Sequence, residues 1–281
     1  WPLALVVAGT LAALALASGA VTATMQPFLQ GTQYVDITST ANDLITVACV
    51  GGVVKVSGAD PTGGAFPCDQ VGAIAVAGGV LGDTLDLSGL DMTRTRLQAA
   101  RLNNANLKGV KFDGVVLDAA WALKSDFTGA SFVGASLFQT QMMDCKIDGA
   151  DFSHAMVGAD MSRASLVNAK FINAMLAPDL TNQSMGLMRG VLKSAKLDGA
   201  SFKGANLARS AFEYASLKGA DFTDANLSGA ELGGADFTGA IVGGANFTGA
   251  DVDSTKLVGL KGAGSAKGLA QAKNYDKAIK D

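Results

Sequence analysis

Residues 225–229 read Ala-Asn-Leu-Ser-Gly, residues 235–239 read Ala-Asp-Phe-Thr-Gly, and residues 245–249 read Ala-Asn-Phe-Thr-Gly. Each unit has a large apolar residue at its centre, a small residue two positions earlier, and Asp or Asn directly before the centre. Related units recur every five residues from about residue 85 to about residue 260. Such a short, fixed period is typical of a solenoid, in which each repeat packs against its neighbours.

This five-residue pattern resembles the pentapeptide-repeat family, whose motif is written A(D/N)LXX. The resemblance extends over residues 85–260. It implies an all-β fold, a right-handed quadrilateral β-helix in which four repeats, or about 20 residues, complete one coil. It implies no particular activity, because members of the family have several different functions.

The twenty-residue coil can be tested within the sequence, because a solenoid stacks like residues on like residues. The apolar centres keep one register from Leu87 to Val157, lose one residue before Met161, and return to the first register at Leu187. With that slip corrected, sorting at intervals of 20 gathers phenylalanine in one column and leucine in the next two. We therefore expect about eight to nine coils. The expected phenylalanine column is Met92, Phe112, Phe132, Phe152, Phe171, Leu192, Phe212, Leu232 and Val252, in which Phe112, Phe132, Phe152, Phe171 and Phe212 form a core ladder.

Composition and charge agree with a narrow solenoid that has no strong electrostatic field. Apolar residues make up 49% of the chain but aromatic residues only 6%, and the 35 glycines suit tight corners. The net charge is −3. Over residues 86–260 there are 18 acidic and 16 basic side chains, a difference of −2. This balance provides no basic surface for a polyanion, so we expect no nucleic-acid partner.

The first 24 residues indicate export. An uncharged apolar run extends from Leu3 to Ala17, and small residues continue through Ala23. The length of the run and the small residues after it are typical of a secretory signal peptide. A retained membrane anchor is an alternative, because the run is just long enough to span a bilayer; a buried helix is a third. We expect an exported protein (periplasmic, lumenal or extracellular), with a membrane tether if the segment is retained.

Residues 31–84 predict a β-structured cap in front of the solenoid. Short β-type runs occur at residues 34–37, 44–47, 53–56 and 73–76, separated by Gly and Pro. A cap is expected because the end of a solenoid exposes unpaired strand edges. Cys49 and Cys68 both fall in this segment, and in an exported protein they predict a disulfide; two free thiols are the alternative.

The sequence offers little chemistry. Residues 78–86 resemble a single degenerate copy of the calcium-binding nonapeptide of RTX proteins, and an ordinary turn is the alternative interpretation. The only histidine, His154, lies two residues after a centre with no catalytic partner in the pattern. Cys145 takes a small inward position and behaves as a buried apolar residue. We expect no enzyme activity, no metal and no cofactor.

The middle of the solenoid contains an interruption and an apolar group. Pro178 removes a backbone donor, so residues 177–186 are interpreted as an insertion. Nearby outward positions are apolar where other outward positions are polar. They predict either a surface for a protein partner or a second copy, or a satellite core covered by the inserted loop. The group consists of Val116, Trp121, Phe138, Met143, Met156 and Met175.

Residues 261–281 leave the five-residue repeat and predict a short helical cap. Residues 262–264 are a glycine-rich exit, and residues 267–279 place four apolar side chains roughly on one side of a helix. These are Leu269, Ala272, Tyr275 and Ile279.

Two functions remain open from the sequence. The first is a non-catalytic, exported scaffold that presents solenoid faces to a protein partner. The second comes from the family resemblance, which includes DNA-mimicking proteins that bind type II topoisomerases. The export-like start and the balanced charge of the repeats both argue for the first.

Overall fold

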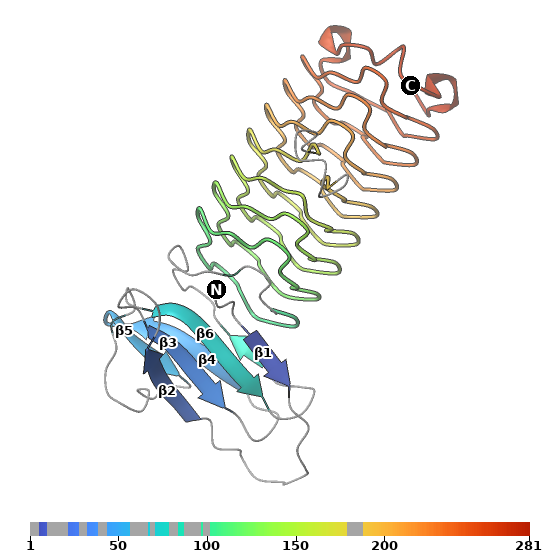
Figure 1. The fold of residues 1–281 in the computed structure, drawn as a ribbon. Coiled ribbons are helices and arrows are strands. Elements are labelled where there is room, and N and C mark those ends of the chain that lie inside the picture. Colours follow the sequence, from blue (N-terminus) through green and yellow to red (C-terminus); the bar gives the residue numbers. More distant parts are fainter. Residues whose placement is uncertain are drawn as a thin grey trace.

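In the computed structural model, the chain forms a tower of stacked coils with two small β-sheets at the end where the tower begins (Figure 1). The structure describes residues 6–9, 22–27, 33–38, 44–56, 67, 71–78, 84–86, 97, 102–178 and 188–281. Along the tower, each coil pairs with the next through isolated parallel bridges, one on each side. The expected four-sided coil is therefore present.

The bridging residues form four rows along the tower, and these rows define faces A to D in chain order. Up to Lys256, each bridging residue directly precedes an apolar centre, so its side chain points outward. Face A carries Asn106, Asp126, Lys146, Ser165, Lys196, Ser216, Asp236, Lys256 and Ile279; face B carries Lys111, Ser131, Asp151, Lys170, Ser201, Asp221, Ile241 and Lys261; face C carries Val116, Ser136, Met156, Met175, Asn206, Asn226, Asn246 and Lys267; face D carries Trp121, Gln141, Asp160, Val191, Ala211, Glu231, Asp251 and Lys273.

The corners explain why glycine is so frequent. The residue two after almost every centre turns the chain with a positive φ, for example +70° at Gly249 and +60° at His154. Glycine adopts this conformation without steric cost, and side-chain-bearing residues take it less readily. The residue two before each centre is small and buried, as at Ala220 and Ala225, because it faces into the narrow core.

Phenylalanine rings stack through the core behind face B. The rings of Phe132 and Phe152 have centroids 4.6 Å apart with planes 2° from parallel, and Phe152 and Phe171 are 4.8 Å apart at 4°. Phe112 continues the stack below, at 5.0 Å from Phe132. All of these rings are fully buried. Stacking follows from the coil spacing, because paired strands lie about 4.8 Å apart.

Above Phe171 the expected column was wrong. The ring that stacks on Phe171 is Phe202, at 4.9 Å and 9°, and not Leu192. Phe212 lies behind face D and meets Phe202 edge-on at 5.7 Å and 85°. The bridge between Lys170 and Ser201 explains the error, because it joins residues 31 apart (201 − 170) instead of about 20. The insertion thus adds 11 residues (31 − 20), and columns assigned beyond it by the five-residue phase were displaced by two faces.

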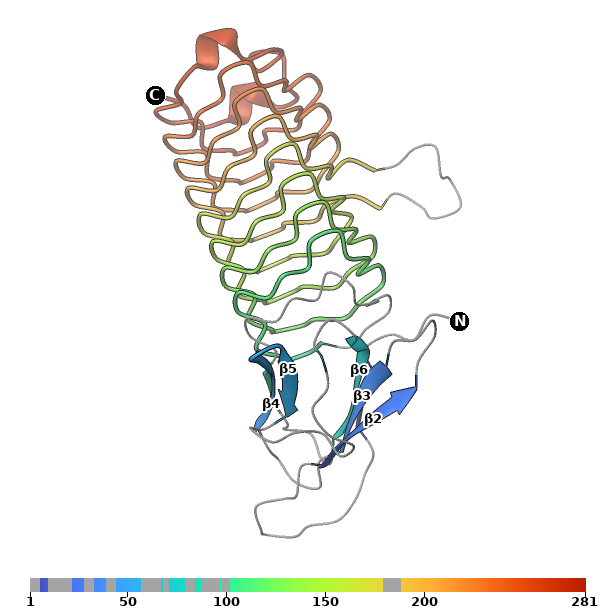
Figure 2. The ribbon, with the colours of Figure 1, turned by 90° about the vertical axis from the view of Figure 1, so that its left-hand side faces the viewer.

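The insertion leaves and re-enters the tower at the corner between faces C and D (Figure 2). Met175 and Val191 are bridging residues on either side of it, so the irregular segment extends beyond the expected 177–186 to Gly190. Gly190 donates its N–H to the carbonyl of Leu176 at 2.8 Å, which closes the loop at its base. Residues 179–187 lie outside the described part of the chain.

The N-terminal region forms two mixed sheets. One has the order β1-β6-β3-β2, with β1 Val6–Gly9, β2 Thr22–Pro27, β3 Gln33–Thr38 and β6 Val71–Gly78. The other has the order β5-β4-β7, with β4 Leu44–Val50, β5 Val53–Val56 and β7 Thr84–Asp86. The four strands predicted from the sequence are present as β3, β4, β5 and β6.

Strand β5 closes the lower end of the tower core. Val54 and Val56 are buried and belong to the same apolar cluster as Leu97 and Leu102 of the first coils. Figure 2 shows β4 and β5 directly beneath the tower. Gly51 and Gly52 join β4 to β5 in a two-residue turn with φ of +61° and +82°. The expected capping role is consistent with this packing.

Residues 1–24, predicted as a signal peptide or anchor, contain β1 and the start of β2 in this structure. β1 pairs in parallel with β6. Among the described residues, no helix has the length and apolar character needed to cross a membrane. The export interpretation stays a prediction.

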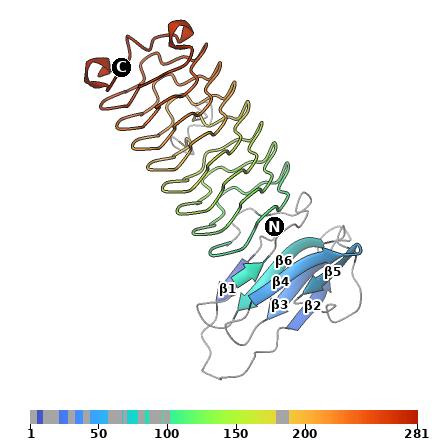
Figure 3. The ribbon, with the colours of Figure 1, turned by 180° about the vertical axis from the view of Figure 1, so that it is seen from behind.

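The predicted C-terminal helix was wrong. Residues 261–279 form one more coil, whose bridging residues are spaced by six: Lys261, Lys267, Lys273 and Ile279. Helical structure here is limited to two 3₁₀ turns, η4 Ala263–Ser265 and η5 Tyr275–Lys277, at the far end of the tower from the sheets (Figure 3). The extra residue in each unit lets the chain fold over the core, where Leu269, Ala272 and Ala278 are buried.

Candidate interaction faces

Carboxylates in the outward rows stabilise the turns by accepting hydrogen bonds. Asp236 accepts hydrogen bonds from the Thr238 backbone N–H at 3.0 Å and from its hydroxyl at 2.5 Å. Asp126 and Asp221 do the same with the threonines two residues after them. These side chains stabilise the bend of their own repeat, as Asx turns do. The recurring carboxylates therefore have a structural role and do not form acid–base pairs.

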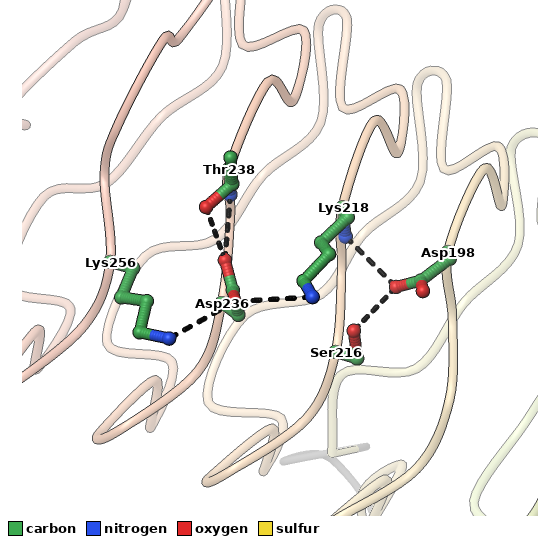
Figure 4. Close-up of polar contacts among 6 residues, drawn as sticks. All are labelled: Asp198, Ser216, Lys218, Asp236, Thr238 and Lys256. Carbon is green, nitrogen blue, oxygen red and sulfur yellow. Dashed lines mark hydrogen bonds and ion pairs between the residues drawn. The ribbon is translucent and has the colours of Figure 1, made fainter.

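Other carboxylates join successive coils. Asp198 accepts from the Ser216 hydroxyl at 2.5 Å and from the Lys218 backbone N–H at 3.1 Å (Figure 4). Asp236 lies between two ammonium groups, Lys256 Nζ at 3.4 Å and Lys218 Nζ at 3.8 Å. Burial raises the pKa of Asp236, but hydrogen bonds from Thr238 and the nearby Lys256 outweigh burial and hold the pKa below its usual value. On this part of face A, the charge of Asp236 is thus paired with two lysines.

The apolar group is divided between faces C and D. Val116, Met156 and Met175 lie in the face C row with exposed fractions of 44%, 44% and 46%, while Trp121 begins the described face D row at 52%. Ser136 separates Val116 from Met156, and Met156 pairs directly with Met175. Phe138 follows a face C centre and Met143 a face D centre, and both are half-buried. The six residues therefore do not form one compact patch. Val116, Met156 and Met175 lie along face C, and the other three lie at its corner with face D or on face D.

Phe138 is held at the corner between faces C and D. A Cβ on Gly158, in the next coil, would lie 2.9 Å from Phe138 Cδ1, so the glycine makes room for the ring. Gly158 also lies in the one unit that is a residue short, because the centres Val157 and Met161 are four residues apart instead of five. The missing residue, the aromatic ring and the insertion thus occupy the same corner in three successive coils.

An ion-pair network fixes the end of the insertion to face D. Arg189 forms two hydrogen bonds to Glu231, Nη1 to Oε1 at 2.8 Å and Nη2 to Oε2 at 2.6 Å, and donates to the Arg209 carbonyl at 2.7 Å. Lys193 pairs with Glu213 at 2.7 Å. The Arg189 guanidinium holds the pKa of Glu231 below its usual value. Each bond crosses to a later coil, so the insertion is anchored where it re-enters the tower.

The described residues contain no cluster of His, Cys, Asp and Glu suited to a metal ion. Cys145 is a free, buried thiol that donates to the Ala122 carbonyl at 2.7 Å, and burial raises its pKa to about 12. His154 is an exposed corner residue. Cys68 and residues 79–83 lie outside the described residues, so the Cys49–Cys68 bridge and the calcium nonapeptide stay predictions.

The four rows of bridges, the inward apolar centres and the positive-φ corners define a four-sided parallel β-solenoid built from five-residue units. The family model for pentapeptide repeats matches eight copies, within residues 86–121, 123–155, 191–224 and 215–257. The chain therefore belongs to the pentapeptide repeat family, whose members fold as right-handed quadrilateral β-helices. No curated protein matches the chain.

Several solved structures resemble the tower. HetL, a pentapeptide repeat protein involved in heterocyst differentiation regulation from the cyanobacterium Nostoc sp. strain PCC 7120, is 23% identical, with 69% of this chain and 84% of that chain covered and a TM-score of 0.37. Full-length QnrB1, a plasmid-mediated fluoroquinolone resistance protein, is 21% identical, with coverages of 69% and 93% and a TM-score of 0.40. A pentapeptide repeat protein of the Arabidopsis thaliana thylakoid lumen is 25% identical, with coverages of 43% and 67% and a TM-score of 0.20.

Sequence reasoning missed the polar half of face C. Above Met175, three asparagines occupy the row, and each amide donates to the residue one coil below. Asn246 Nδ2 lies 3.3 Å from Asn226 Oδ1, Asn226 Nδ2 lies 3.2 Å from Asn206 Oδ1, and Asn206 Nδ2 lies 3.2 Å from Met175 Sδ. The twenty-residue spacing of Asn206, Asn226 and Asn246 is visible in the sequence and could have revealed this ladder.

Proposed function

We propose that this chain is a non-catalytic, exported scaffold whose solenoid binds a protein partner. The observation that carries the proposal is the exposure of Val116, Trp121, Met156 and Met175 on a surface whose other outward positions are mostly polar. Methionine and tryptophan are enriched where proteins meet, and exposed apolar groups of this kind mark interaction surfaces. No enzyme family is indicated by the comparisons.

Charge pairing weighs against the alternative of a DNA mimic. Such a protein needs a surface with the dense negative charge of a duplex. Here aspartates on faces A and B are matched by lysines at 3.1 to 3.5 Å, as in Lys203–Asp221, Lys170–Asp151 and Lys108–Asp126. These pairs cancel much of the negative field that a DNA-binding partner would recognise.

Changing Trp121 and Met156 together to serine tests the proposed surface. We expect association with the native partner to be lost and the melting temperature to stay nearly unchanged, because both side chains are about half exposed. The measurements are pull-down from the compartment of residence and thermal unfolding by circular dichroism. A matched variant, Val133→Ser with Tyr214→Ser, removes exposed side chains from face B and from the corner between faces D and A, and it should still bind.

A loss of stability without a loss of association would support the covered-core interpretation. If the inserted loop covers Trp121 and Met156, the double variant should lose a few kcal/mol of stability, as other core truncations do, while association stays the same. Equal binding with equal stability would contradict both interpretations of the apolar group.

Export is tested by the mature N-terminus. If residues 1 to about 23 are a signal peptide, N-terminal sequencing of the exported protein should find a start between Ser18 and Thr24. A mass measured without reductant should then show the Cys49–Cys68 bridge. A mature chain that keeps residues 3–17 in the membrane would support the anchor instead, and two free thiols would exclude the bridge.

A further inference from the structure

Face C differs from the other three faces because it is almost free of charge. Between Asp118 and Lys267, none of the described residues directly before or after a face C centre carries a charge. Faces A, B and D carry both signs over the same coils. Directly before the centres, face C carries Ser136, Met156, Met175, Asn206, Asn226 and Asn246; directly after them it carries Phe138, Gly158, Ala177, Ala208, Ser228 and Thr248.

A charge-free face favours a charge-free occupant. A charged partner group placed there would lose its hydration without gaining a counter-charge, which is unfavourable. The charged faces impose that desolvation cost on any surface that covers them. Of the four faces, face C is therefore the one that another uncharged protein surface can cover with the smallest desolvation cost.

Face C is complementary to itself under a two-fold axis parallel to the tower. Such an axis brings the residue before each centre opposite the residue after the same centre in the second copy. Met175 then meets Ala177, and Met156 meets Gly158 beside the Phe138 ring that packs against that glycine, so the exposed methionines face a small residue or an aromatic ring. An isologous contact of this kind uses one surface twice.

The asparagine half of face C pairs in the same arrangement. The two lone pairs of Asn226 Oδ1 are engaged by the Ser228 backbone N–H at 3.1 Å and by Asn246 Nδ2 at 3.3 Å. Each asparagine amide therefore has a free N–H and no free acceptor site. Thr248 Oγ1 donates to Asn246 Oδ1 at 2.7 Å, which leaves its lone pairs free to accept. Asn246 and Thr248 of opposite copies are thus matched as donor and acceptor.

We propose that face C is a self-association surface, on which a second copy of this chain packs side by side with its tower pointing in the same direction. The inference rests on the proposed function, because it assigns an occupant to the methionine row of that surface. Six rungs at about 4.8 Å give a strip of about 30 Å by 10 Å, or about 600 Å² for both copies together. This is less than stable dimers bury, so the dimer is weak, with a dissociation constant on the order of 0.1 mM.

Sedimentation equilibrium of the purified protein up to about 1 mM tests self-association. The wild type should dimerise, and its dimerisation should be nearly independent of salt, because no charges are screened. Met156→Lys and the milder Met175→Ser should each weaken the dimer about tenfold or more. Val133→Lys is the matched control, because it adds the same charge to an exposed apolar site on face B, and it should dimerise as the wild type does. Thermal unfolding checks that the variants are folded.

Cross-linking tests the arrangement. Asn226→Cys and Ser228→Cys, made as separate variants and mixed under oxidising conditions, should form a disulfide-linked heterodimer. Either variant alone carries the same native cysteines and should cross-link at most at background level. Cross-linking within the Asn226→Cys variant alone that matches the mixture would overturn the side-by-side geometry.

Three results would overturn the inference. They are a wild type that stays monomeric at about 1 mM, a dimer that survives both methionine variants, and equal weakening by Val133→Lys. A monomeric wild type whose Trp121→Ser/Met156→Ser variant still loses a different protein partner would remove the inference and leave the proposed function standing. A protein that dimerises through face C but binds no different protein partner would support the inference and remove the proposed function.

Discussion

Replacing Phe152 with alanine is expected to lower the free energy of unfolding by about 3–5 kcal/mol. The ring is fully buried and lies between Phe132 and Phe171, with centroid separations of 4.6 and 4.8 Å. Its removal loses the transfer free energy of the ring and leaves a cavity between two coils that their backbone bridges hold apart. Neighbouring coils cannot close the gap without breaking the hydrogen bonds on four faces.

Urea unfolding followed by circular dichroism measures this effect. Val133→Ala is the control, because Val133 lies in an adjacent coil on the same side but is 36% exposed, and it should change stability by less than about 0.5 kcal/mol. Phe152→Leu keeps most of the volume and should fall between the two. A Phe152→Ala protein as stable as the wild type would contradict the stacked core.

Replacing Gly268 with valine is expected to release the C-terminal coil. A Cβ at this position would lie 2.7 Å from Thr248 Oγ1 and 2.9 Å from the backbone Cα and N of Thr248. The φ of +68° is also a conformation that a β-branched residue avoids. Relief of both conflicts requires the coil to move away from Thr248, at a cost of about 2 kcal/mol or more.

Hydrogen exchange localises this loss. The amides of Lys267, Lys273 and Ile279 bond to the coil below at 2.7, 2.8 and 2.9 Å, so their protection should fall by about 30-fold for a 2 kcal/mol loss. Gly264→Val is the matched control, because a Cβ there meets nothing within 4 Å and its φ is not positive. Equal exchange in the two variants would show that the close contact at Gly268 does not hold the coil.

The sequence predicted the tower well up to Leu176, because coil stacking repeats the same residue types at fixed intervals. It failed beyond the insertion for an arithmetic reason. A coil with one extra residue and a coil with 11 extra residues leave the later apolar centres in the same five-residue register. The two cases differ by ten residues, however, so every later centre lies two faces away. Only the pairing of one coil with the next, as between Lys170 and Ser201, distinguishes them, and that is a tertiary contact.

At the C-terminus, one set of apolar residues was compatible with two structures. Leu269, Ala272 and Tyr275 are spaced by three, which matches one side of a helix and also matches six-residue units. The recurring Lys-Gly or Lys-Asn pairs at 261, 267 and 273 decide for the coil, because Gly262, Gly268 and Asn274 all have a positive φ. The outward positions of the apolar group were predictable from the repeat phase, and so was their division between two neighbouring faces, because all six residues precede the insertion.

The corner between faces C and D has a practical consequence for engineering. One coil there is a residue short and the next has 11 extra residues, yet Phe152, Phe171 and Phe202 stack without interruption. Chain length at this corner is therefore uncoupled from the core. A foreign epitope or a small folded domain grafted between Pro178 and Met188 would be displayed at a fixed height on a rigid rod, held at its base by Arg189 and Glu231.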